Sequence, residues 1–299
     1  MDLAFVEFVQ SFRNGFLDLF FSLITEFGGD LIFLVVGTLL FWLYDKRFGY
    51  RFMTVFLITL GINDIFKNFI RRPRPFATGA ESVTEETYGY SMPSAHASNV
   101  GIMALILNER FGKLKRFVTP VIFTVMVLVG FSRVYLGQHY LSDVMMGFVL
   151  AFGVYYGIKV VGPKITLSGT TVISVTLAVF FIFMVVFGLA REGLGIEPES
   201  FRNLYIAFGS VLGLTVGHII ELKYVGYKEK APWKIQLVKY LIGLVVALMI
   251  QEGLKVILPY NNMGEMGSVV LDSLRYFILT MWLSLGALFT FKQIFKTYQ

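Results

Sequence analysis

The chain of 299 residues contains no cysteine and only three histidines. The absence of cysteine excludes a thiol nucleophile, a thiolate zinc site and disulfides, although it says little about the compartment. No cluster of histidines and carboxylates suggests a bound metal, so we expect neither a metal nor another cofactor. Charged residues make up 15% of the chain and hydrophobic residues 56%. With a mean hydropathy of +0.69, the chain is too apolar for a soluble fold of this length.

Hydrophobic stretches long enough to cross a bilayer recur along the chain, where a span needs about 20 residues. The pattern predicts an all-α, polytopic transmembrane helical bundle of about nine spans. We expect the spans near Phe27–Tyr44, Phe52–Ile70, Ala95–Leu107, Phe117–Leu136, Leu141–Val161, Thr170–Ala190, Leu204–Ile220, Ile235–Leu258 and Ser268–Phe291. Ala95–Leu107 is short for a span, but a segment typical of a cytoplasmic turn, Glu109–Arg116, follows it.

The first stretch, Leu3–Thr25, has a different pattern. Polar residues recur there at steps of three or four, with phenylalanine and leucine on the other face: Glu7, Gln10, Arg13 or Asn14, and Asp18. This pattern predicts an amphipathic helix over residues 1–26 that lies in the membrane interface, and a short sixth catalytic span is the alternative. Acidic residues stand where the basic start of a signal peptide would be, so we expect no signal peptide.

Basic residues concentrate in alternate loops between the expected spans, and this bias predicts the orientation of the chain. These residues are Lys46, Arg47, Arg51, Arg110, Lys113, Lys115, Arg116, Lys159, Lys164, Lys223, Lys228, Lys230, Lys234, Lys292 and Lys296. Loops rich in lysine and arginine face the cytoplasm, so we expect the N-terminus outside and the C-terminus in the cytoplasm. This arrangement also explains the net charge of +6 without a nucleic-acid partner.

Three groups of polar residues interrupt the first half of the chain, all at the expected non-cytoplasmic ends of helices. They are Lys67, Arg74 and Pro75, then Pro93–His96, then Ser132, Arg133, His139 and Asp143. Lysine and arginine side chains can hold the oxygens of a phosphate, the arginines through their fork of donors. One neutral histidine can attack phosphorus, and a second, protonated one can neutralise the leaving oxygen. The spacings predict phosphoryl transfer without a metal, through a phosphohistidine.

Asp143 follows His139 by four residues. On a helix the two side chains would share a face, and the carboxylate could fix the tautomer of the imidazole. The pair by itself could equally be structural, but the presence of Arg133 upstream favours a functional role.

The first group also has a purely structural interpretation. Lys67 could be a lysine that snorkels from a helix end, and we interpret Arg71 and Arg72 in that way or as holding the loop. Only Arg74 has the spacing of the motif. The helix should break before Pro73, which would turn Arg74 towards the site.

His96 would, taken alone, be a capping or packing histidine. Beside Ser94, at a helix N-terminus whose free N–H groups attract anions, a functional role is favoured. His218 lies outside any motif, and we interpret it as structural.

In order and content, the three groups resemble the signature of the type-2 phosphatidate phosphatase (PAP2) superfamily of integral membrane lipid phosphatases. Ala95 replaces the usual glycine of Pro-Ser-Gly-His; it keeps the N–H donor but disfavours positive φ, so the loop must close without that conformation. The resemblance covers a catalytic core of five spans at residues 27–164. Residues 165–299 contain no motif and are expected to form a four-helix membrane extension.

The resemblance also implies a role for each motif residue. His139 would attack phosphorus, while His96 would protonate the leaving oxygen and then activate water. The charge on the phosphate oxygens would be stabilised by Lys67, Arg74, Ser94, the Ala95 N–H and Arg133. The catalytic set is therefore His139, His96 and Asp143, on the non-cytoplasmic side of the plasma membrane.

The expected function is hydrolysis of a lipid phosphate or diphosphate at the outer leaflet, with undecaprenyl diphosphate or a phosphatidate-type lipid as substrate. An alternative is a phosphomonoesterase resembling the sphingosine-phosphate phosphatases or glucose-6-phosphatase, which also carry extra helices. The segment Tyr88–His96 looks closer to the sphingosine-phosphate type. A lipid transporter or scramblase is an alternative of a different class, but it would need no set of catalytic histidines. Vanadium haloperoxidases have similar motifs, but they are soluble enzymes, and nine expected spans argue against that class.

Four charged residues of the extension are expected near the outer ends of its last two helices: Glu252, Lys255, Asp272 and Arg275. Charges at this depth are costly unless they are paired or face a polar cavity. Two interpretations follow, namely interhelical ion pairs or a wall of the substrate pocket.

Overall fold

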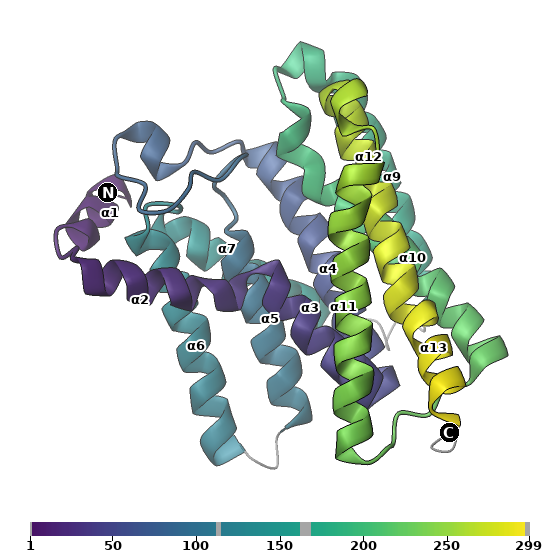
Figure 1. Ribbon diagram of the computed structural model, residues 1–299. Helices are drawn as coiled ribbons and strands as arrows, with labels where there is room; N and C mark the ends of the chain where they lie inside the picture. Colours follow the sequence, from purple (N-terminus) through teal and green to yellow (C-terminus); the bar gives the residue numbers. More distant parts are fainter. Residues whose placement is uncertain (1, 112–114, 162–168, 297–299) are drawn as a thin grey trace. The chain divides into compact units, whose positions relative to one another are not determined.

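The computed structural model describes residues 2–111, 115–161 and 169–296, and every regular element within these residues is helical (Figure 1). The chain separates into two compact units: Met1–Phe33 with Ile62–Val172, and Leu34–Gly61 with Ile173–Gln299. The long helix α4, Lys46–Ile70, contributes residues to both units. The expected boundary between residues 164 and 165 lies outside the described residues.

The first unit contains the three polar groups. Its helices, besides the end of α4 and the beginning of α3 (Asp30–Leu39), are α1 (Asp2–Gln10), α2 (Gly15–Thr25), α5 (Ala95–Arg110), α6 (Lys115–Tyr135) and α7 (Leu141–Tyr156). Figure 1 shows α1 and α2 lying across the ends of α5, α6 and α7 that carry the polar groups. The expectation of a single N-terminal helix is wrong. The chain breaks after α1, and Asn14 starts α2 by accepting a hydrogen bond from the Leu17 N–H at 3.0 Å.

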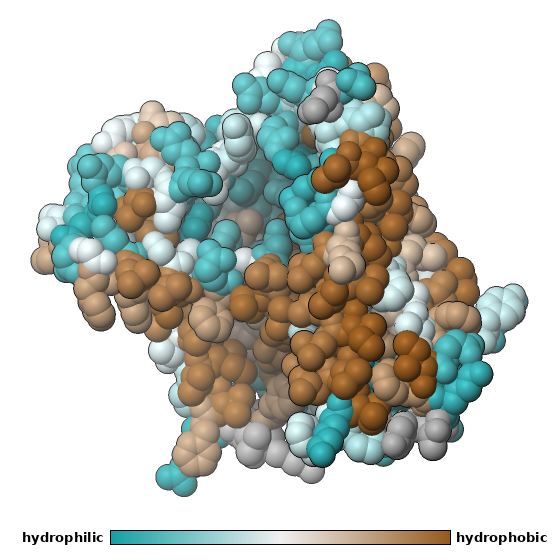
Figure 2. Space-filling view, in the orientation of Figure 1, coloured by the Kyte–Doolittle hydropathy of each residue, from teal (hydrophilic) through white to brown (hydrophobic). Residues whose placement is uncertain are grey.

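One face of α1 and α2 is apolar and exposed. Phe8, Phe12, Phe16 and Leu19 are 59%, 60%, 76% and 63% exposed, and hydrophobic residues line the lower edge of this segment in Figure 2. Such a face is typical of a helix that lies in the membrane interface. The position of α1 and α2 in a bilayer stays a prediction.

Seven helices of the described residues are long and apolar enough to cross a membrane. They are Lys46–Thr78, Arg116–Tyr135, Leu141–Val160, Gly169–Leu194, Pro198–Val225, Trp233–Ile257 and Gly264–Ile294. The segments Gly15–Gly28 and Asp30–Tyr44 would together form an eighth span, bent by 48°. Helix α5, which was expected to span, has only 16 residues. The expected number of nine is therefore approximate.

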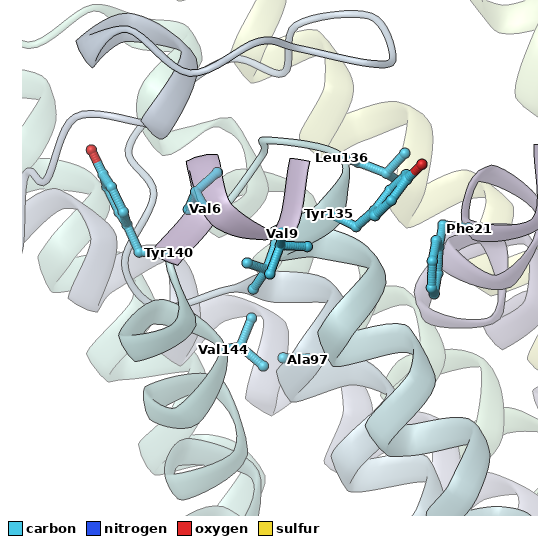
Figure 3. Packing of buried hydrophobic residues seen from close by; sticks show 9 residues of the cluster. Val6, Val9, Phe21, Ala97, Tyr135, Leu136, Tyr140 and Val144 are labelled. Carbon is cyan, nitrogen blue, oxygen red and sulfur yellow. The ribbon is translucent and has the colours of Figure 1, made fainter. Parts of the chain in front are cut away.

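The core beneath α1 joins the N-terminal segment to the elements that carry the polar groups (Figure 3). Val6 and Val9 of α1 are 0% and 6% exposed. They belong to one buried cluster with Ala97 at the start of α5, Leu136 after α6 and Val144 of α7. Each Å² of apolar surface that this cluster removes from water stabilises the arrangement by about 25 cal/mol.

The second unit contains the helices after residue 169 and the first part of α4. These helices are α9 (Gly169–Leu194), α10 (Arg202–Ile220), α11 (Trp233–Ile257), α12 (Gly264–Met281) and α13 (Ala287–Ile294). Helices α10 and α12 approach closely because Gly209 and Gly213 of α10 have no side chain. A Cβ at Gly209 would lie 2.0 Å from the Ser273 backbone oxygen, and a Cβ at Gly213 would lie 2.3 Å from the Phe277 backbone oxygen. Figure 2 shows that the visible face of α11 is hydrophobic.

His218 lies in this second unit. Its ring stacks on Tyr50, with ring centroids 4.0 Å apart, and it packs at an angle against Phe41. These contacts agree with a structural role.

Candidate active site

The end of α4 supplies the first two cations. Lys67 lies in the last turn and is 6% exposed, so it does not snorkel to a surface. The helix ends at Ile70, before Pro73 as expected. Arg74, 5% exposed, then follows in extended backbone.

The guanidinium of Arg74 binds two segments of the loops around it. Nε donates to the Gly89 oxygen at 2.9 Å and Nη2 to the Tyr88 oxygen at 2.9 Å. Nη1 donates to the Gln138 oxygen at 3.1 Å and lies 3.3 Å from His139 Nε2. Carbonyl groups of both loops therefore fix the guanidinium with one donor group directed at the imidazole.

Helix α5 begins at the second polar group. Ser94 is its N-cap, with Oγ accepting from the Ala97 N–H at 3.5 Å, and Ala95 and His96 are the first two helical residues. The first N–H groups of a helix have no partner within it and attract anions. Among the described residues, Arg71 is the only one other than glycine with a positive φ. The loop therefore closes at Ala95 without that conformation, as expected.

His96 is half-buried, and its imidazole forms no hydrogen bond with any other described residue. Burial and the charges of Arg133, Lys67 and Arg74 lower the pKa of the His96 imidazole well below its usual value, so His96 is neutral in the free protein.

The end of α6 supplies Arg133, 4% exposed, whose Nη1 donates to Thr25 Oγ1 at 3.0 Å. The N–H of His139 donates back to the Arg133 oxygen at 3.1 Å, which brings His139 beside this arginine. The turn between them needs a glycine at 137: φ there is +73°, and a Cβ would lie 1.9 Å from the Glu81 oxygen.

The expectation that His139 and Asp143 share a helix face is wrong. Helix α7 begins at Leu141, so His139 precedes it, and Asp143 lies in its first turn. Asp143 Oδ2 accepts a hydrogen bond from the Tyr140 N–H at 2.9 Å and lies 3.6 Å from His139 Nδ1. The two residues do meet, through the turn that caps α7. The distance is too long for a hydrogen bond, and catalytic hydrogen bonds often tighten only when substrate binds.

Burial lowers the pKa of the His139 imidazole well below its usual value, and the charges of Arg74, Arg133 and Lys67 lower it further. A neutral imidazole keeps a lone pair on one ring nitrogen, which is what a nucleophile needs. The three cations that surround it form no ion pair with a carboxylate in the part of the chain that the structure describes. Asp64, Asp143 and Glu26 act on them without forming an ion pair with them.

Buried cations without carboxylate partners are costly in the absence of an anion. This group of side chains therefore has the charge and the donors to bind an anion such as phosphate beside a nucleophilic nitrogen.

Sequence reasoning missed the role of Arg72. Its Nη1 donates to Asp143 Oδ1 at 2.8 Å and its Nη2 to Asp2 Oδ2 at 2.8 Å. The guanidinium also lies over the Tyr140 ring, 3.9 Å from its centroid. The signal was present, since Arg72 and Arg74 each precede a proline, but the spacing from Lys67 pointed only to Arg74.

The four charged residues of the extension divide into two ion pairs, each within one helix. Glu252 and Lys255 of α11 pair at the surface, with side chains 63% and 47% exposed. Asp272 and Arg275 of α12 pair at 2.9 Å and are buried. Asp272 also receives hydrogen bonds from Arg202 Nε at 2.6 Å and from the Tyr260 hydroxyl at 2.8 Å. The second pair is thus joined to a neighbouring helix, α10.

Comparison with known proteins agrees with this geometry. The sequence matches the PAP2 superfamily over residues 48–167. It matches the transmembrane extension of PAP2 superfamily phosphatases over residues 205–297. The second match falls within the segment that the sequence predicts as an extension.

Two curated relatives are phosphatases. A probable sphingosine-1-phosphate phosphatase of Dictyostelium discoideum is 26% identical over 231 residues, which is 72% of this chain and 55% of that protein. Phosphatidylglycerophosphatase B of Bacillus subtilis is 30% identical over 141 residues, which is 45% of this chain and 68% of that protein.

A solved PAP2-type phosphatidylglycerolphosphate phosphatase of Bacillus subtilis is 29% identical, with a TM-score of 0.46 over 55% of this chain and 85% of that one. The chain spans about half the length of the Dictyostelium relative. The chain belongs to the PAP2 superfamily and is an integral, multi-pass membrane protein.

Proposed function

We propose that this chain hydrolyses a lipid phosphate or diphosphate through a phosphohistidine on His139. The observation that carries the proposal is the set of three buried cations without carboxylate partners around the neutral imidazole of His139. The relatives support it, because their names describe phosphatases that act on phosphorylated lipids.

In the first step His139 Nε2 attacks phosphorus, and the bond from phosphorus to the lipid oxygen breaks. The bound phosphate offsets the neighbouring cations and lets His96 take up a proton, which it gives to the leaving oxygen. The leaving group is the lipid alcohol of a monophosphate or the lipid phosphate of a diphosphate. Asp143 holds the Nδ1–H of the imidazole, and Lys67, Arg74, Arg133 and the N-terminus of α5 with Ser94 and Ala95 stabilise the charge on the equatorial oxygens.

In the second step His96, now a base, takes a proton from water. The hydroxide attacks phosphorus, the bond to His139 breaks, and inorganic phosphate leaves. Both histidines then return to their starting states.

We place this chemistry on the non-cytoplasmic side of the plasma membrane, with the C-terminus in the cytoplasm. The support is the distribution of basic loops, because lysine and arginine concentrate on the cytoplasmic side of membrane proteins. The substrate would then be a lipid of the outer leaflet, of the undecaprenyl diphosphate or phosphatidate type.

A sphingosine-phosphate-like monoester is a second candidate substrate. The match to the Dictyostelium relative extends over 72% of this chain, well beyond the motifs. A panel of lipid monophosphates and diphosphates, assayed for phosphate release by purified protein in a buffer with chelator, separates the candidates. Release by wild type but not by His139→Ala supports the function. A protein that releases phosphate from none of the lipids is no lipid phosphatase.

A further inference from the structure

Arg72 connects the carboxylate beside His139 to the first helix of the chain. Its two terminal nitrogens each donate to a carboxylate at 2.8 Å, Nη1 to Asp143 and Nη2 to Asp2. Because it is paired on both sides, it differs from the three cations of the anion site. Its guanidinium is further fixed by the ring of Tyr140 beneath it.

Ser142 closes this contact into a ring of hydrogen bonds. Its hydroxyl donates to Asp2 Oδ2 at 2.5 Å and accepts from Arg72 Nη1 at 2.6 Å. These hydrogen bonds, from Ser142 and then from Arg72, lower the pKa of Asp2 below its usual value. Asp2 is therefore a charged member of the ring at neutral pH.

The position of Asp2 is set by the packing of α1. Val6 and Val9 are buried against the motif elements, as Figure 3 shows. At the other end of the helix, Gln10 Nε2 donates to the Glu81 oxygen at 2.7 Å and to the Tyr135 oxygen at 3.2 Å. Apolar packing and hydrogen bonds at both ends thus hold α1 in one place.

The two oxygens of Asp143 have separate partners. Oδ1 faces Arg72, while Oδ2 receives the Tyr140 N–H and faces His139 Nδ1. Rotation of the carboxylate would exchange the two oxygens, and the hydrogen bond from Arg72 opposes that rotation. Partners of this kind orient a group that itself contacts the reacting residue.

We infer that Asp2 and Arg72 are positioning residues that hold the Asp143 carboxylate toward His139, so that helix α1 forms part of the catalytic apparatus. The inference rests on the proposed function, in which His139 is the nucleophile. It assigns a catalytic consequence to a helix that lies outside the matched PAP2 segment, residues 48–167.

The expected defect is in the phosphorylation step. An Asp143 carboxylate that is free to rotate holds the required tautomer of His139 for less of the time, which lowers kcat. The cations that bind phosphate are unchanged, so KM and the affinity for inorganic phosphate should stay within about twofold, as for loss of an interaction made only in the transition state. A purely structural role would instead lower stability and activity together.

The test is the rate of phosphoenzyme formation in the full chain, purified in detergent, with a labelled lipid phosphate that the wild type hydrolyses. We expect Asp2→Asn to slow this step about 10-fold and Arg72→Met about 100-fold, the range seen when the hydrogen-bond partners of metal ligands are removed. Arg72→Lys should restore part of the loss, since one ammonium cannot span both carboxylates.

Asp18→Asn is the matched control. Asp18 lies on the same N-terminal segment and pairs with Arg13 at 3.2 Å, but its hydrogen bonds go to Arg13 and Tyr135 and none to Asp143. Its phosphorylation rate should equal that of wild type. Thermal unfolding and the binding of inorganic phosphate by every variant show whether the protein is folded.

A double-mutant cycle with Asp143→Asn gives the decisive comparison. If Asp2 acts through Asp143, adding Asp2→Asn to Asp143→Asn should cause no further loss. Losses that multiply, or an Asp2→Asn variant with the wild-type phosphorylation rate, would overturn the inference while leaving the function intact. If Arg72→Met does not fold, Asp2→Asn and Arg72→Lys decide. A wild type that forms no phosphoenzyme would overturn both the function and the inference.

Discussion

Arg74 Nη1 lies 3.3 Å from His139 Nε2, the ring nitrogen opposite the one that faces Asp143. An arginine donor thus stands beside the atom that we propose as the nucleophile. In the proposed mechanism a phosphoryl oxygen would take the position next to this donor as phosphorus approaches the nitrogen. The relationship makes the geometry of Arg74, and not only its charge, important for the reaction.

The first prediction concerns that geometry. Arg74→Lys keeps the charge, but a single ammonium cannot bind the Tyr88, Gly89 and Gln138 oxygens while also facing the substrate. We expect kcat/KM to fall by about 10²- to 10³-fold, as for loss of a donor to the transition state.

The control for this prediction is Arg71→Lys, which changes an arginine whose Nε donates to the Asn68 oxygen. Steady-state kinetics with one lipid phosphate would compare the two variants. If Arg74→Lys lowers kcat/KM as little as Arg71→Lys does, Arg74 acts only through its charge.

The second prediction concerns the protonation of His139. Its pKa is lowered by burial and by three neighbouring cations, so the free enzyme should hold it neutral at pH values where an ordinary histidine, with a pKa of about 6.5, is mostly protonated. NMR of histidine-labelled protein in detergent can follow the three histidines, with His139→Gln to assign the signal.

A titration midpoint at or above 6.5 would contradict this. The sign for stability follows from the same shift. Below pH 6.5 the unfolded state binds the proton more readily, so the contribution of His139 to stability is lost as the pH falls from 6.5 towards the folded-state pKa.

The third prediction concerns orientation. A single cysteine at Glu86, exposed in the loop before Pro93, should react with a membrane-impermeant thiol reagent in intact cells. One at Lys230, an exposed residue of a basic loop, should react only after lysis. The chain has no cysteine of its own, so each label reports one position. The reverse pattern would place the chemistry in the cytoplasm.

The fourth prediction concerns the buried charges of the extension. Asp272→Ala leaves Arg275, 3% exposed, without its carboxylate, and this should cost about 3–5 kcal/mol of stability. Burial and the hydrogen bond to Asp272 raise the pKa of Tyr260 to about 12, so its hydroxyl stays a donor and cannot replace the lost charge.

The matched control is Glu252→Ala, which breaks the exposed pair with Lys255 and should change stability by less than about 0.5 kcal/mol. Thermal unfolding tests both variants. If Asp272 and Arg275 instead line the substrate pocket, Arg275→Met should change KM among lipid headgroups more than it changes stability.

Much of the site could be predicted from the sequence because phosphate chemistry needs particular residue types at fixed spacings. The sequence predicts a common site for Lys67, Arg74, Arg133 and His139, and in the structure the three cations act on the His139 imidazole. The break before Pro73 and the N-cap at Ser94 followed from local backbone rules.

The remaining features depend on tertiary contacts that leave no periodic signal. The sequence gives no indication that Asp2 meets Arg72, some 70 residues away, or that Thr25 meets Arg133. The spacing of His139 and Asp143 fits a helix, but the tertiary structure instead places a capping turn there. The count of spans failed where a helix is short or bent, as in α5 and in the pair formed by Gly15–Gly28 and Asp30–Tyr44.

The central claim is that His139 becomes phosphorylated, and the direct measurement is to trap the intermediate. Purified protein would be mixed with a lipid carrying labelled phosphate, quenched in alkali within milliseconds, digested and mapped. We predict an acid-labile label on His139 that is absent from His139→Ala. In His96→Ala, which lacks the acid of the first step and the base of the second, the label should form slowly from a substrate with a good leaving group and then persist. A label on His96, or turnover in wild type without any phosphoenzyme, would contradict the account.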